Sequence, residues 1–471
     1  MAELTSIILA AGQGTRMNSS LPKVLHPLLG RPMLQYIVDA SIKVGSSRTI
    51  VVVGFEGQQV IDTIDQGHGL GQGQAQAQAH DLQYVWQKQQ LGTGHAVMMA
   101  QEILSKVDGD LLVLYGDTPL LRAETIQELL KTKRTQQAAA AVLTTQLVEP
   151  KGFGRIIRNS AGTIQGIIEE KDASTEERKI TEVNTGVYCF EIPLLLKALH
   201  EITPRNAQGE YYLTDVIKVM AGKGLRVIGV VTAAAEEVMG PNDRIQLAQT
   251  ENFLKQAINQ RWMSSGVTIQ DPSFTYIGPE VEIGRDTTVL PGTFLQGKTI
   301  IGEHCIIGPH TKIIDSVIEH HTTVQFSQIV QAHLGPENNV GPYTYVRPGT
   351  VSAAKVKIGD FVEIKNCQIG IGTKVPHLTY LGDSELGAGV NIGAGTITCN
   401  YDGVSKHRTV IKDGAFIGSN ANLVAPVTIG EKATIGAGST ITKEVPDNAL
   451  AVARSKQEVK TGWRSPRERE K

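Results

Sequence analysis

Residues 277–313 read IGPEVEIGRDTTVLPGTFLQGKTIIGEHCIIGPHTKI, and every sixth position of this stretch is aliphatic. A second series of the same kind runs in steps of six from Ile411 to Ile441. Neither an α-helix, with about 3.6 residues per turn, nor a single strand, with a period of about 2, requires this spacing. We interpret each hexad as one short strand plus a corner of a left-handed parallel β-helix of hexapeptide repeats, with its aliphatic residue directed at the axis.

The hexads also predict which residues stack. Glycine follows many of the aliphatic residues, as in Ile283-Gly284, because a sharp corner favours a missing Cβ. If three hexads form one turn, residues 18 apart lie on neighbouring coils, about 4.8 Å from one another. Val346 and Ile364 fit this register, so the cations Arg347 and Lys365 that follow them should point outward, one above the other.

The length of 471 residues exceeds what one hydrophobic core usually organises, so we expect two domains. The predicted division is an α/β nucleotide-binding, Rossmann-like domain at 1–239, a helical linker at 240–262 and the β-helix at 263–471. The β-helix ends in a basic tail that begins at Lys456.

Short apolar runs predict the strands of the first domain. They lie at 6–11, 49–53, 110–115 and 226–231, and continuous runs of this kind are typical of a parallel sheet covered on both faces. Residues 66–80 are rich in Gly, Gln and Ala, which indicates a mobile surface insertion without chemistry.

Composition narrows the class of protein. The 45 basic and 47 acidic residues nearly balance, so we expect neither nucleic acid nor a membrane surface as a partner. Four scattered cysteines without a C-x-x-C pair favour reduced thiols. No apolar run approaches about 18 residues, and the first residues lack the basic region of a signal peptide. We therefore expect a cytoplasmic protein.

A glycine-rich turn follows the first predicted strand. The stretch LAAGQGTRM (9–17) lets backbone amides approach a phosphate, and Arg16 and the later Lys23 add positive charge. The turn matches neither G-x-G-x-x-G nor the Walker A pattern, so an ordinary strand–helix connection is the alternative.

Asp117 follows another predicted strand, in YGDTP (115–119), at the same edge of the sheet. Mg²⁺ usually takes one or two protein oxygens together with water and phosphate, and Asp117 fits such a ligand. Asn242 is a candidate second ligand, although it could equally cap the linker helix.

Taken together, the motifs LAAGQGTRM, LPK, QLGTGHA, YGDTP, GFGRI, EEKDA, VNTGVY and QGEYYLTD closely resemble one enzyme family. It is the bifunctional N-acetylglucosamine-1-phosphate uridylyltransferase/glucosamine-1-phosphate N-acetyltransferase family. The resemblance implies that the β-helix acetylates glucosamine 1-phosphate from acetyl-CoA. It also implies that the α/β domain transfers UMP from UTP to the product, with Mg²⁺ as cofactor, and that the protein is a homotrimer.

The resemblance also implies roles for individual residues. Arg16 and Lys23 would stabilise charge on the phosphates, and Asp117 and Asn242 would hold Mg²⁺. The nucleotide and sugar would be bound by Leu9, Ala10, Ala11, Gly12, Lys23, Gln87, Gly92, Thr93, Tyr115, Gly116, Asp117, Gly154, Glu169, Asn184 and Asn242.

For the β-helix, the resemblance makes His377 the general base that deprotonates the amine. His377 follows Lys365 by 12 residues, which predicts a place near the edge that holds the cations or across a subunit boundary. Glucosamine 1-phosphate would contact Arg347, Lys365, Tyr380 and Asn391. Acetyl-CoA would contact Ala394, Asn400, Tyr401, Ser419, Ala437 and Arg454.

The hexads lapse between Thr398 and Thr409, which predicts a loop that leaves the β-helix and contains Asn400, Tyr401 and Lys406. Two alternatives remain open at this stage. One is a single-activity sugar-1-phosphate nucleotidyltransferase whose β-helix only oligomerises the protein. The other is a scaffold without activity, which the Gly12–Lys23 segment and Asp117 disfavour.

Overall fold

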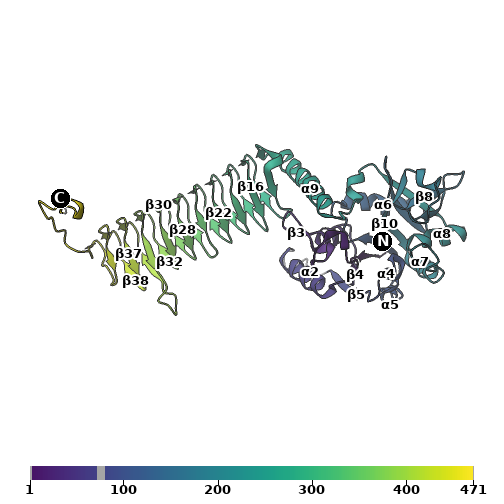
Figure 1. Cartoon of the computed structure of the whole chain (residues 1–471), viewed down its shortest axis with the longest axis horizontal. Helices are drawn as coiled ribbons and strands as arrows, with labels where there is room; N and C mark the ends of the chain where they lie inside the picture. The colour runs from purple at the N-terminus through teal and green to yellow at the C-terminus, as the bar shows by residue number, and fades with distance from the viewer. Residues whose placement is uncertain (1–2, 72–79, 470–471) are drawn as a thin grey trace. The chain divides into compact units, whose positions relative to one another are not determined.

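The computed structural model describes residues 3–71 and 80–469. The chain forms two compact units, Met1–Leu254 and Lys255–Lys471 (Figure 1). The division falls inside helix α9 (Arg244–Ser264), which occupies the segment predicted as a helical linker. Within the described residues, no helix combines the length and apolarity needed to cross a bilayer.

The first unit is built on a nine-stranded mixed sheet. Its main path runs, in spatial order, through β11 (Val227–Thr232), β7 (Ala140–Gln146), β10 (Glu182–Glu191), β6 (Asp110–Tyr115), β1 (Leu4–Leu9), β4 (Arg48–Val53) and β5 (Asp81–Trp86). The hairpin β8 (Arg155–Arg158) and β9 (Ile164–Ile168) extends from β10. All four runs predicted as strands are confirmed, as β1, β4, β6 and β11.

The sheet is not parallel throughout, as the parallel sheet of the prediction would be, because β10 and the β8–β9 hairpin pair antiparallel. β10 pairs antiparallel with both β6 and β7, whereas β1, β4, β5 and β6 are parallel to one another. β10 follows the β8–β9 hairpin, so the chain reverses without the helical crossover that a parallel strand requires. The register between β10 and β7 shifts between Asn184 and Tyr188.

Helices cover both faces of this sheet, as predicted. Alternate residues of each strand face opposite sides, so Ile7 and Val113 lie in one core and Ile8 and Leu114 in the other. The first core is completed by α4 (Thr93–Met98), α5 (Gln101–Leu104), α7 (Ile192–Leu199) and α8 (Thr214–Gly222). The second is completed by α1 (Met33–Lys43), α2 (Gly57–Gly71) and α6 (Ala123–Thr135). Helix α2 reaches into the 66–80 stretch, of which residues 72–79 lie outside the described residues.

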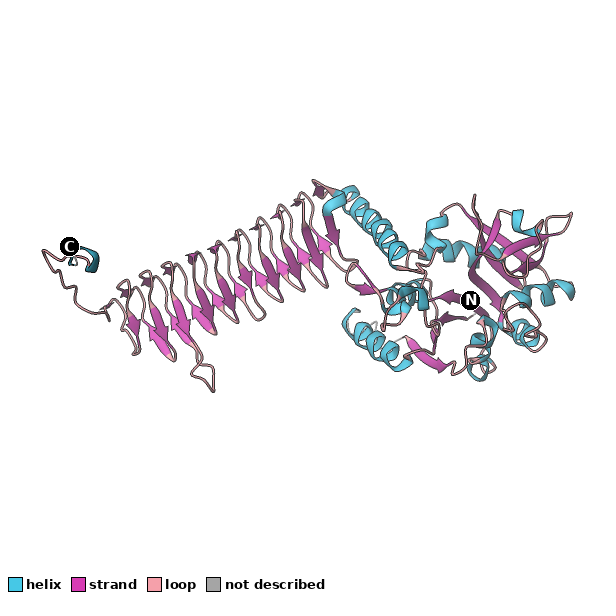
Figure 2. Ribbon diagram, viewed as in Figure 1, coloured by secondary structure: helices cyan, strands magenta, loops and turns pink. Residues whose placement is uncertain are grey.

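The second unit is the β-helix that the hexads predict (Figures 1 and 2). Its short strands stack into three parallel sheets, called here sheets I, II and III. Sheet I runs from β12 (Thr268–Ile269) to β41 (Leu450–Ala451), sheet II from β13 (Thr275–Ile277) to β40 (Thr440–Ile441), and sheet III from β14 (Glu282–Ile283) to β38 (Val427–Ile429). Ile277, Leu295 and Ile313 are fully buried and pair in steps of 18, which confirms the register.

The glycines of the hexads serve more than one purpose: Gly308 has a φ of +103°, as a sharp corner favours, whereas others are excluded from carrying a side chain by close packing. A Cβ on Gly284 would lie 2.5 Å from the backbone nitrogen of Glu303 on the next coil, so close approach excludes a side chain there. The residues with left-handed backbone at this corner are instead Asp286 and His304, whose φ angles are 60° and 56°.

The lapse in the hexads is confirmed as a loop. The chain leaves the β-helix after β34 (Ile397–Cys399) and returns at β35 (Thr409–Ile411), and the excursion projects from the stack in Figure 2. A bridge between Tyr401 and Lys406 closes it into a narrow hairpin.

Candidate active sites

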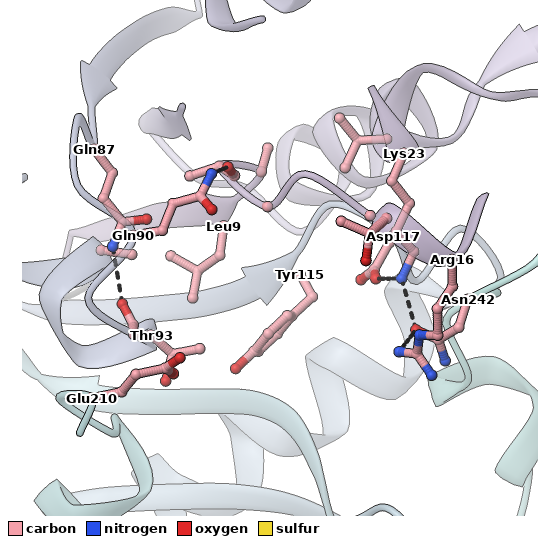
Figure 3. A pocket seen from close by; sticks show the side chains of 18 residues that line it. Leu9, Arg16, Lys23, Gln87, Gln90, Thr93, Tyr115, Asp117, Glu210 and Asn242 are labelled. Carbon is pink, nitrogen blue, oxygen red and sulfur yellow. Dashed lines mark hydrogen bonds and ion pairs between the residues drawn. The ribbon is translucent and has the colours of Figure 1, made fainter. Parts of the chain in front are cut away.

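A cavity of about 420 Å³ opens at the carboxyl ends of β1, β5 and β6 (Figure 3). β1 lies between β4 and β6 in the sheet. The connections that follow neighbouring strands lie on opposite sides at this point, so a crevice forms at this edge. The cavity is lined by Leu9, Ala10, Ala11, Gly12, Gly14, Thr15, Arg16, Lys23, Val24, Gln87, Gln90, Gly92, Thr93, Ala96, Tyr115, Asp117, Glu210 and Asn242. The structure thus brings together most residues that the sequence proposed for the nucleotide.

One end of the cavity is charged. Lys23 forms an ion pair with Asp117, and its Nζ also donates to Oδ1 of Asn242 at 3.1 Å. Arg16 donates to the same oxygen at 2.8 Å. Gly14 allows this approach, because its φ is +65° and a Cβ there would lie 2.5 Å from Cβ of Lys23. Two cations and two oxygen ligands therefore meet at one point (Figure 3).

These oxygens also test the expected magnesium site. Asp117 and Asn242 both contact the ammonium group of Lys23, and Asn242 also accepts from Arg16. One carboxylate and one amide oxygen fit the small number of protein ligands that Mg²⁺ takes beside phosphate and water. Within residues 3–71 and 80–469, His, Cys, Asp and Glu form no group of three or more that could hold a metal. The residues present therefore fit a metal that is shared with a phosphate substrate.

Two glutamines shape the other end of the cavity. The amide nitrogen of Gln87 donates to the carbonyl oxygen of Gly92 and to Nδ1 of His95, each at 3.0 Å. The amide nitrogen of Gln90 donates to the carbonyl oxygen of Ala11 at 2.9 Å. Carbonyl oxygens only accept, so both amide orientations are fixed and both side-chain oxygens remain available as acceptors.

Gly92 and Thr93 begin helix α4 at this end. Gly92 has a φ of +103°, and a Cβ there would lie 2.6 Å from the carbonyl oxygen of Tyr211. The hydroxyl of Thr93 accepts from the backbone nitrogen of Leu213 at 3.1 Å. This turn therefore requires glycine for both its conformation and its packing.

Gly154, Glu169 and Asn184 do not line this cavity, but they lie together beside it. A Cβ on Gly154 would meet Oε2 of Glu169 at 3.4 Å and Cβ of Asn184 at 3.6 Å. Burial raises the pKa of Glu169, whose Oε1 accepts from Thr214 at 2.9 Å. Burial also raises the pKa of Tyr115, and the charge of Glu169 adds to that shift. Tyr115 therefore connects this group with the cavity.

A second cavity of about 540 Å³ extends on this side. It shares Arg16, Tyr115, Asp117 and Asn242 with the first, and Phe153 and Thr185, neighbours of Gly154 and Asn184, also line it. The charged end therefore lies between two hollows, one towards Gln87 and one towards the Gly154 group. Gly116 lines neither cavity; its amide donates to the carbonyl oxygen of Leu9 at 3.0 Å and joins β6 to β1.

The sequence reasoning missed Gln90 and Glu210, which line the first cavity. Both lie in motifs noted for the resemblance, QLGTGHA and QGEYYLTD, and the only available signal was their polarity inside those motifs.

In the β-helix, the structure gathers one group of predicted residues at the ends of sheet II strands. Arg347 and Lys365 follow Val346 in β25 (Tyr345–Val346) and Ile364 in β28 (Glu363–Lys365), which pair in register as expected. The hydroxyl of Tyr380 in β31 (Tyr380–Gly382) and the amide of Asn400 both lie within 2.6 Å of where a Cβ on Gly382 would be.

Other charged residues lie next to Arg347 and Lys365. Arg347 pairs with Glu363 at 2.6 Å, which offsets its charge beside Lys365. Lys406, from the excursion, lies beside Lys365 and is the main cause that lowers its pKa, to which burial and Arg347 add. Asp383 lies nearby: burial opposes its ionisation, but hydrogen bonds from Asn366 and Asn400 and the charges of Lys365 and Lys406 hold its pKa below the ordinary value.

A second group lies at another corner. His377 ends β30 (Lys374–His377) of sheet I, and its Nδ1 lies 2.6 Å from Oδ1 of Asp360. Four predicted acetyl-CoA residues, Ala394, Ser419, Ala437 and Arg454, continue this corner on successive coils. The backbone nitrogens of Asn420 and Gly438 donate to the carbonyl oxygens of Ala394 and Ser419. The guanidinium group of Arg454 donates to the carbonyl oxygen of Ala437. Asn391 lies on the same sheet, in β33 (Asn391–Ile392), away from Arg347 and Lys365.

His377 therefore does not lie near the edge that holds the cations, and that part of the expectation is wrong. His377 precedes β31, whereas Lys365 pairs with Gly382 at the end of β31. The strand has three residues, so about 10 Å of backbone separates the two corners. The alternative, that His377 and the cations meet across a subunit boundary, stays a prediction. Tyr401 is 61% exposed on the excursion, with its hydroxyl bonded to the carbonyl oxygen of Gly403.

Comparison with known proteins agrees with both halves. Residues 6–180 match the MobA-like NTP transferase domain, and residues 280–315 and 408–443 match the bacterial transferase hexapeptide model. A protein of Carboxydothermus hydrogenoformans named bifunctional protein GlmU is 50% identical over 455 residues, which cover 96% of this chain and 98% of that protein. The bifunctional protein GlmU of Brevibacillus brevis is 48% identical and covers 97% of this chain and 96% of its own length.

Proposed function

The chain belongs to the family of bifunctional GlmU proteins, and on that premise we propose how its residues divide the two reactions. The protein is an N-acetylglucosamine-1-phosphate uridylyltransferase and a glucosamine-1-phosphate N-acetyltransferase. The β-helix transfers acetyl from acetyl-CoA to glucosamine 1-phosphate. The α/β domain transfers UMP from UTP to N-acetylglucosamine 1-phosphate and releases pyrophosphate, which yields UDP-N-acetylglucosamine for cell-wall synthesis.

We propose that UTP lies in the 420 Å³ cavity with its base at the Gln87 end and its phosphates at Arg16 and Lys23. The backbone of Leu9–Gly12 and the turn at Gly92 and Thr93 would hold the nucleoside. The observation that supports this most is the convergence of Arg16 and Lys23 on Asn242 at the far end of the cavity. Both cations lie where negative charge would accumulate.

The sugar would bind on the other side of this charged end. Gly154, Glu169 and Asn184 would contact the N-acetylglucosamine moiety, and the second cavity supports a sugar phosphate there. Such a substrate would face the nucleotide phosphates across Arg16 and Tyr115.

The nucleophile of uridylyl transfer is a phosphate oxygen that is already ionised, so no strong base is required. That oxygen forms a bond to the α-phosphorus of UTP, and the bond to the leaving pyrophosphate breaks. Arg16 and Lys23 align the two phosphates and stabilise the charge that develops. Asp117 and Asn242 would hold Mg²⁺, which supplies further charge neutralisation when bound.

For acetyl transfer, we propose His377 as the base. Its imidazole would take a proton from the ammonium group of glucosamine 1-phosphate, and the free amine would attack the thioester carbonyl. Arg347, Lys365 and Tyr380 would bind the sugar phosphate, and Asn391 would assist from sheet I. Acetyl-CoA would follow the corner formed by Ala394, Ser419, Ala437 and Arg454, with Asn400 and Tyr401 contributed by the excursion.

We further propose a cytoplasmic homotrimer whose acetyl-transfer sites lie between subunits. The separation of His377 from Arg347 and Lys365 within one chain supports sites shared by two copies. An exposed aromatic corner supports association: Phe326, Tyr343 and Phe361 follow one another with ring centroids 5.7 and 5.3 Å apart, and Leu378 continues the column directly after His377. Tyr343 and Phe361 are 57% and 59% exposed.

The decisive experiment supplies glucosamine 1-phosphate and acetyl-CoA without UTP and follows release of the CoA thiol. Wild type should release CoA, and His377→Ala should lose at least about 100-fold of that rate, the lower range for a general base. Pyrophosphate release from UTP and N-acetylglucosamine 1-phosphate should be equal in both proteins. Full acetyl transfer by His377→Ala would remove His377 as the base.

A further inference from the structure

Asp360 and His377 form a pair of neighbouring rungs in sheet I. Asp360 ends β27 (Lys357–Asp360), His377 ends β30, and the two residues are partners in the parallel ladder. Their side chains leave the same corner in the same direction, which brings Oδ1 of Asp360 to 2.6 Å from Nδ1 of His377. The fold itself therefore fixes this contact.

The contact determines which ring nitrogen of His377 is free. The hydrogen bond from His377 is the largest cause that lowers the pKa of Asp360, and the charges of His377 and Lys357 act in the same direction. An ionised carboxylate only accepts, so Nδ1 must carry the proton. In the neutral ring, Nε2 is then the unprotonated nitrogen and can act as the base.

Other histidines of the β-helix show the contrast. His333 pairs with Glu319 at 2.6 Å and His407 pairs with Asp402 at 2.7 Å, and both use Nε2 for the carboxylate. In those pairs the nitrogen at the tip of the ring is occupied. At His377 the carboxylate takes Nδ1 and leaves the tip available.

Few other charged groups face this pair. β27 supplies Asp360 and Lys357, and Lys374 of β30 is the ladder partner of Lys357. On the following coil, β33 begins with the neutral Asn391, and Ala394 continues the corner. Asp360 is therefore the anion in contact with the ring.

We propose that Asp360 is a positioning residue for acetyl transfer, which holds His377 in the tautomer and orientation that direct Nε2 at the substrate amine. This inference rests on the proposed role of His377 as the base. In the step, Nε2 takes one proton from the ammonium group of glucosamine 1-phosphate. The amine nitrogen forms a bond to the acetyl carbon and loses a second proton to water, the carbon–sulfur bond breaks, and the imidazolium passes its proton to the CoA thiolate. Asp360 keeps its charge throughout and stabilises the transient imidazolium.

The test is the pH profile of CoA release by Asp360→Asn, which retains an oxygen but removes the charge. Without the anion the imidazolium is less stable, so the acid limb of kcat/KM should move to lower pH by about 0.5–1 unit. The weaker base should also lower the plateau of kcat by about 10-fold, with KM for glucosamine 1-phosphate nearly unchanged. Asp360→Glu should keep the acid limb near that of wild type.

Glu319→Gln is the matched control, because it alters a carboxylate–histidine pair of equal length on the same β-helix, and its profile should equal that of wild type. A wild-type rate of uridylyl transfer and a wild-type oligomer mass in solution verify that each variant is folded and assembled. If Asp360→Asn does not assemble, Asp360→Ala, which also removes the charge, decides: an acid limb displaced to lower pH with wild-type KM supports the proposal, and an acid limb at the wild-type position overturns it. A wild-type profile for Asp360→Asn beside an inactive His377→Ala overturns it. Activity in His377→Ala would instead remove the proposed base.

Discussion

Each part of this chain contains a pair of cations, and their surroundings differ. In the α/β domain, Lys23 has a side chain that is 12% exposed, forms an ion pair with Asp117, and shares Asn242 with Arg16 at the end of a cavity. In the β-helix, Arg347 is 36% exposed on an open face and pairs with Glu363. Lys365 faces the ammonium group of Lys406. In the first arrangement, residues of one chain surround the cations on several sides. In the second, the cations lie on an open surface of the β-helix.

The difference follows from the two architectures. Loops at the end of an α/β sheet surround a substrate on several sides, because strands far apart in sequence end at the same edge. A β-helix has flat sheets and convex corners, so a single copy offers residues on its outside and forms only open hollows, such as the one of about 440 Å³ beside Glu385 and Asp413. Residues proposed for one reaction can then lie on two corners, as His377 and Lys365 do. We propose that a neighbouring copy completes such a site.

The largest expected effect comes from mixing two inactive variants. His377→Ala and Lys365→Ala should each release little CoA alone. In mixed oligomers an interface can combine Lys365 of one chain with His377 of the next, so activity should rise about 100-fold above either variant. The measurement is CoA release after co-expression of differently tagged chains. A mixture that stays inactive, although both tags copurify, would place both residues of one site in the same chain.

Arg16→Ala should lower kcat for uridylyl transfer by about 100-fold, the scale of one lost group that stabilises developing charge. CoA release should be unchanged, because the β-helix does not use Arg16. The matched control is Arg226→Ala, which removes an exposed arginine of the same domain that bonds Gln136. A near-normal rate of pyrophosphate release would remove Arg16 from the mechanism.

A charge introduced at the aromatic corner should weaken association of the chains, which should lower acetyl transfer but leave uridylyl transfer unchanged. Phe361→Asp places a carboxylate in the stack with Tyr343, which should weaken association and lower CoA release about 10-fold at low protein concentration. Uridylyl transfer should persist. Ile371→Asp is the control, since Ile371 is also exposed, at 52%, but lies outside this column. Mass photometry against concentration provides the measurement, and equal assembly of both variants would exclude this corner from the interface.

Glu169→Gln should have the smallest effect on catalysis, a rise of about 3–10-fold in KM for N-acetylglucosamine 1-phosphate, because an amide still accepts one hydrogen bond. Although the substitution weakens substrate binding, it should increase the free energy of unfolding. Burial raises the pKa of Glu169 in the folded protein, so the native state binds the proton more tightly than the unfolded chain does. Ionisation therefore costs stability as pH rises through the window above its ordinary pKa.

The stability prediction is checked by thermal unfolding at two pH values. Without substrate, the Gln variant should melt at a higher temperature than wild type at pH 8, and the difference should shrink towards pH 5. A variant that is less stable at both pH values would show that the Glu169 carboxylate supports the fold.

The β-helix could be predicted almost completely from the sequence. Each hexad repeats the same local requirement, an aliphatic residue that faces the axis, so Ile277, Leu295 and Ile313 determine the register without long-range information. The close contact that requires glycine at position 284 could not be predicted, because the atom that excludes a Cβ there belongs to the next coil.

The α/β domain was predictable in its parts rather than in its assembly. Apolar runs identified β1, β4, β6 and β11, but the reversed direction of β10 depends on a hairpin whose course the local pattern does not contain. Gln90 and Glu210 escaped notice because polar residues in loops are common, and only the folded chain directs these two into the cavity.

The sequence by itself determined the two architectures, the glycine turn at 9–14 and the kinds of charged residue that each half provides, because these depend on local spacing and composition. The tertiary structure decided which of them meet. Lys23 reaches Asp117 and Asn242 across 94 and 219 residues, a contact that exists only because parallel strands end at one edge. Likewise His377 and Lys365, only 12 residues apart, lie on different corners because a turn of the β-helix and a strand of sheet II separate them.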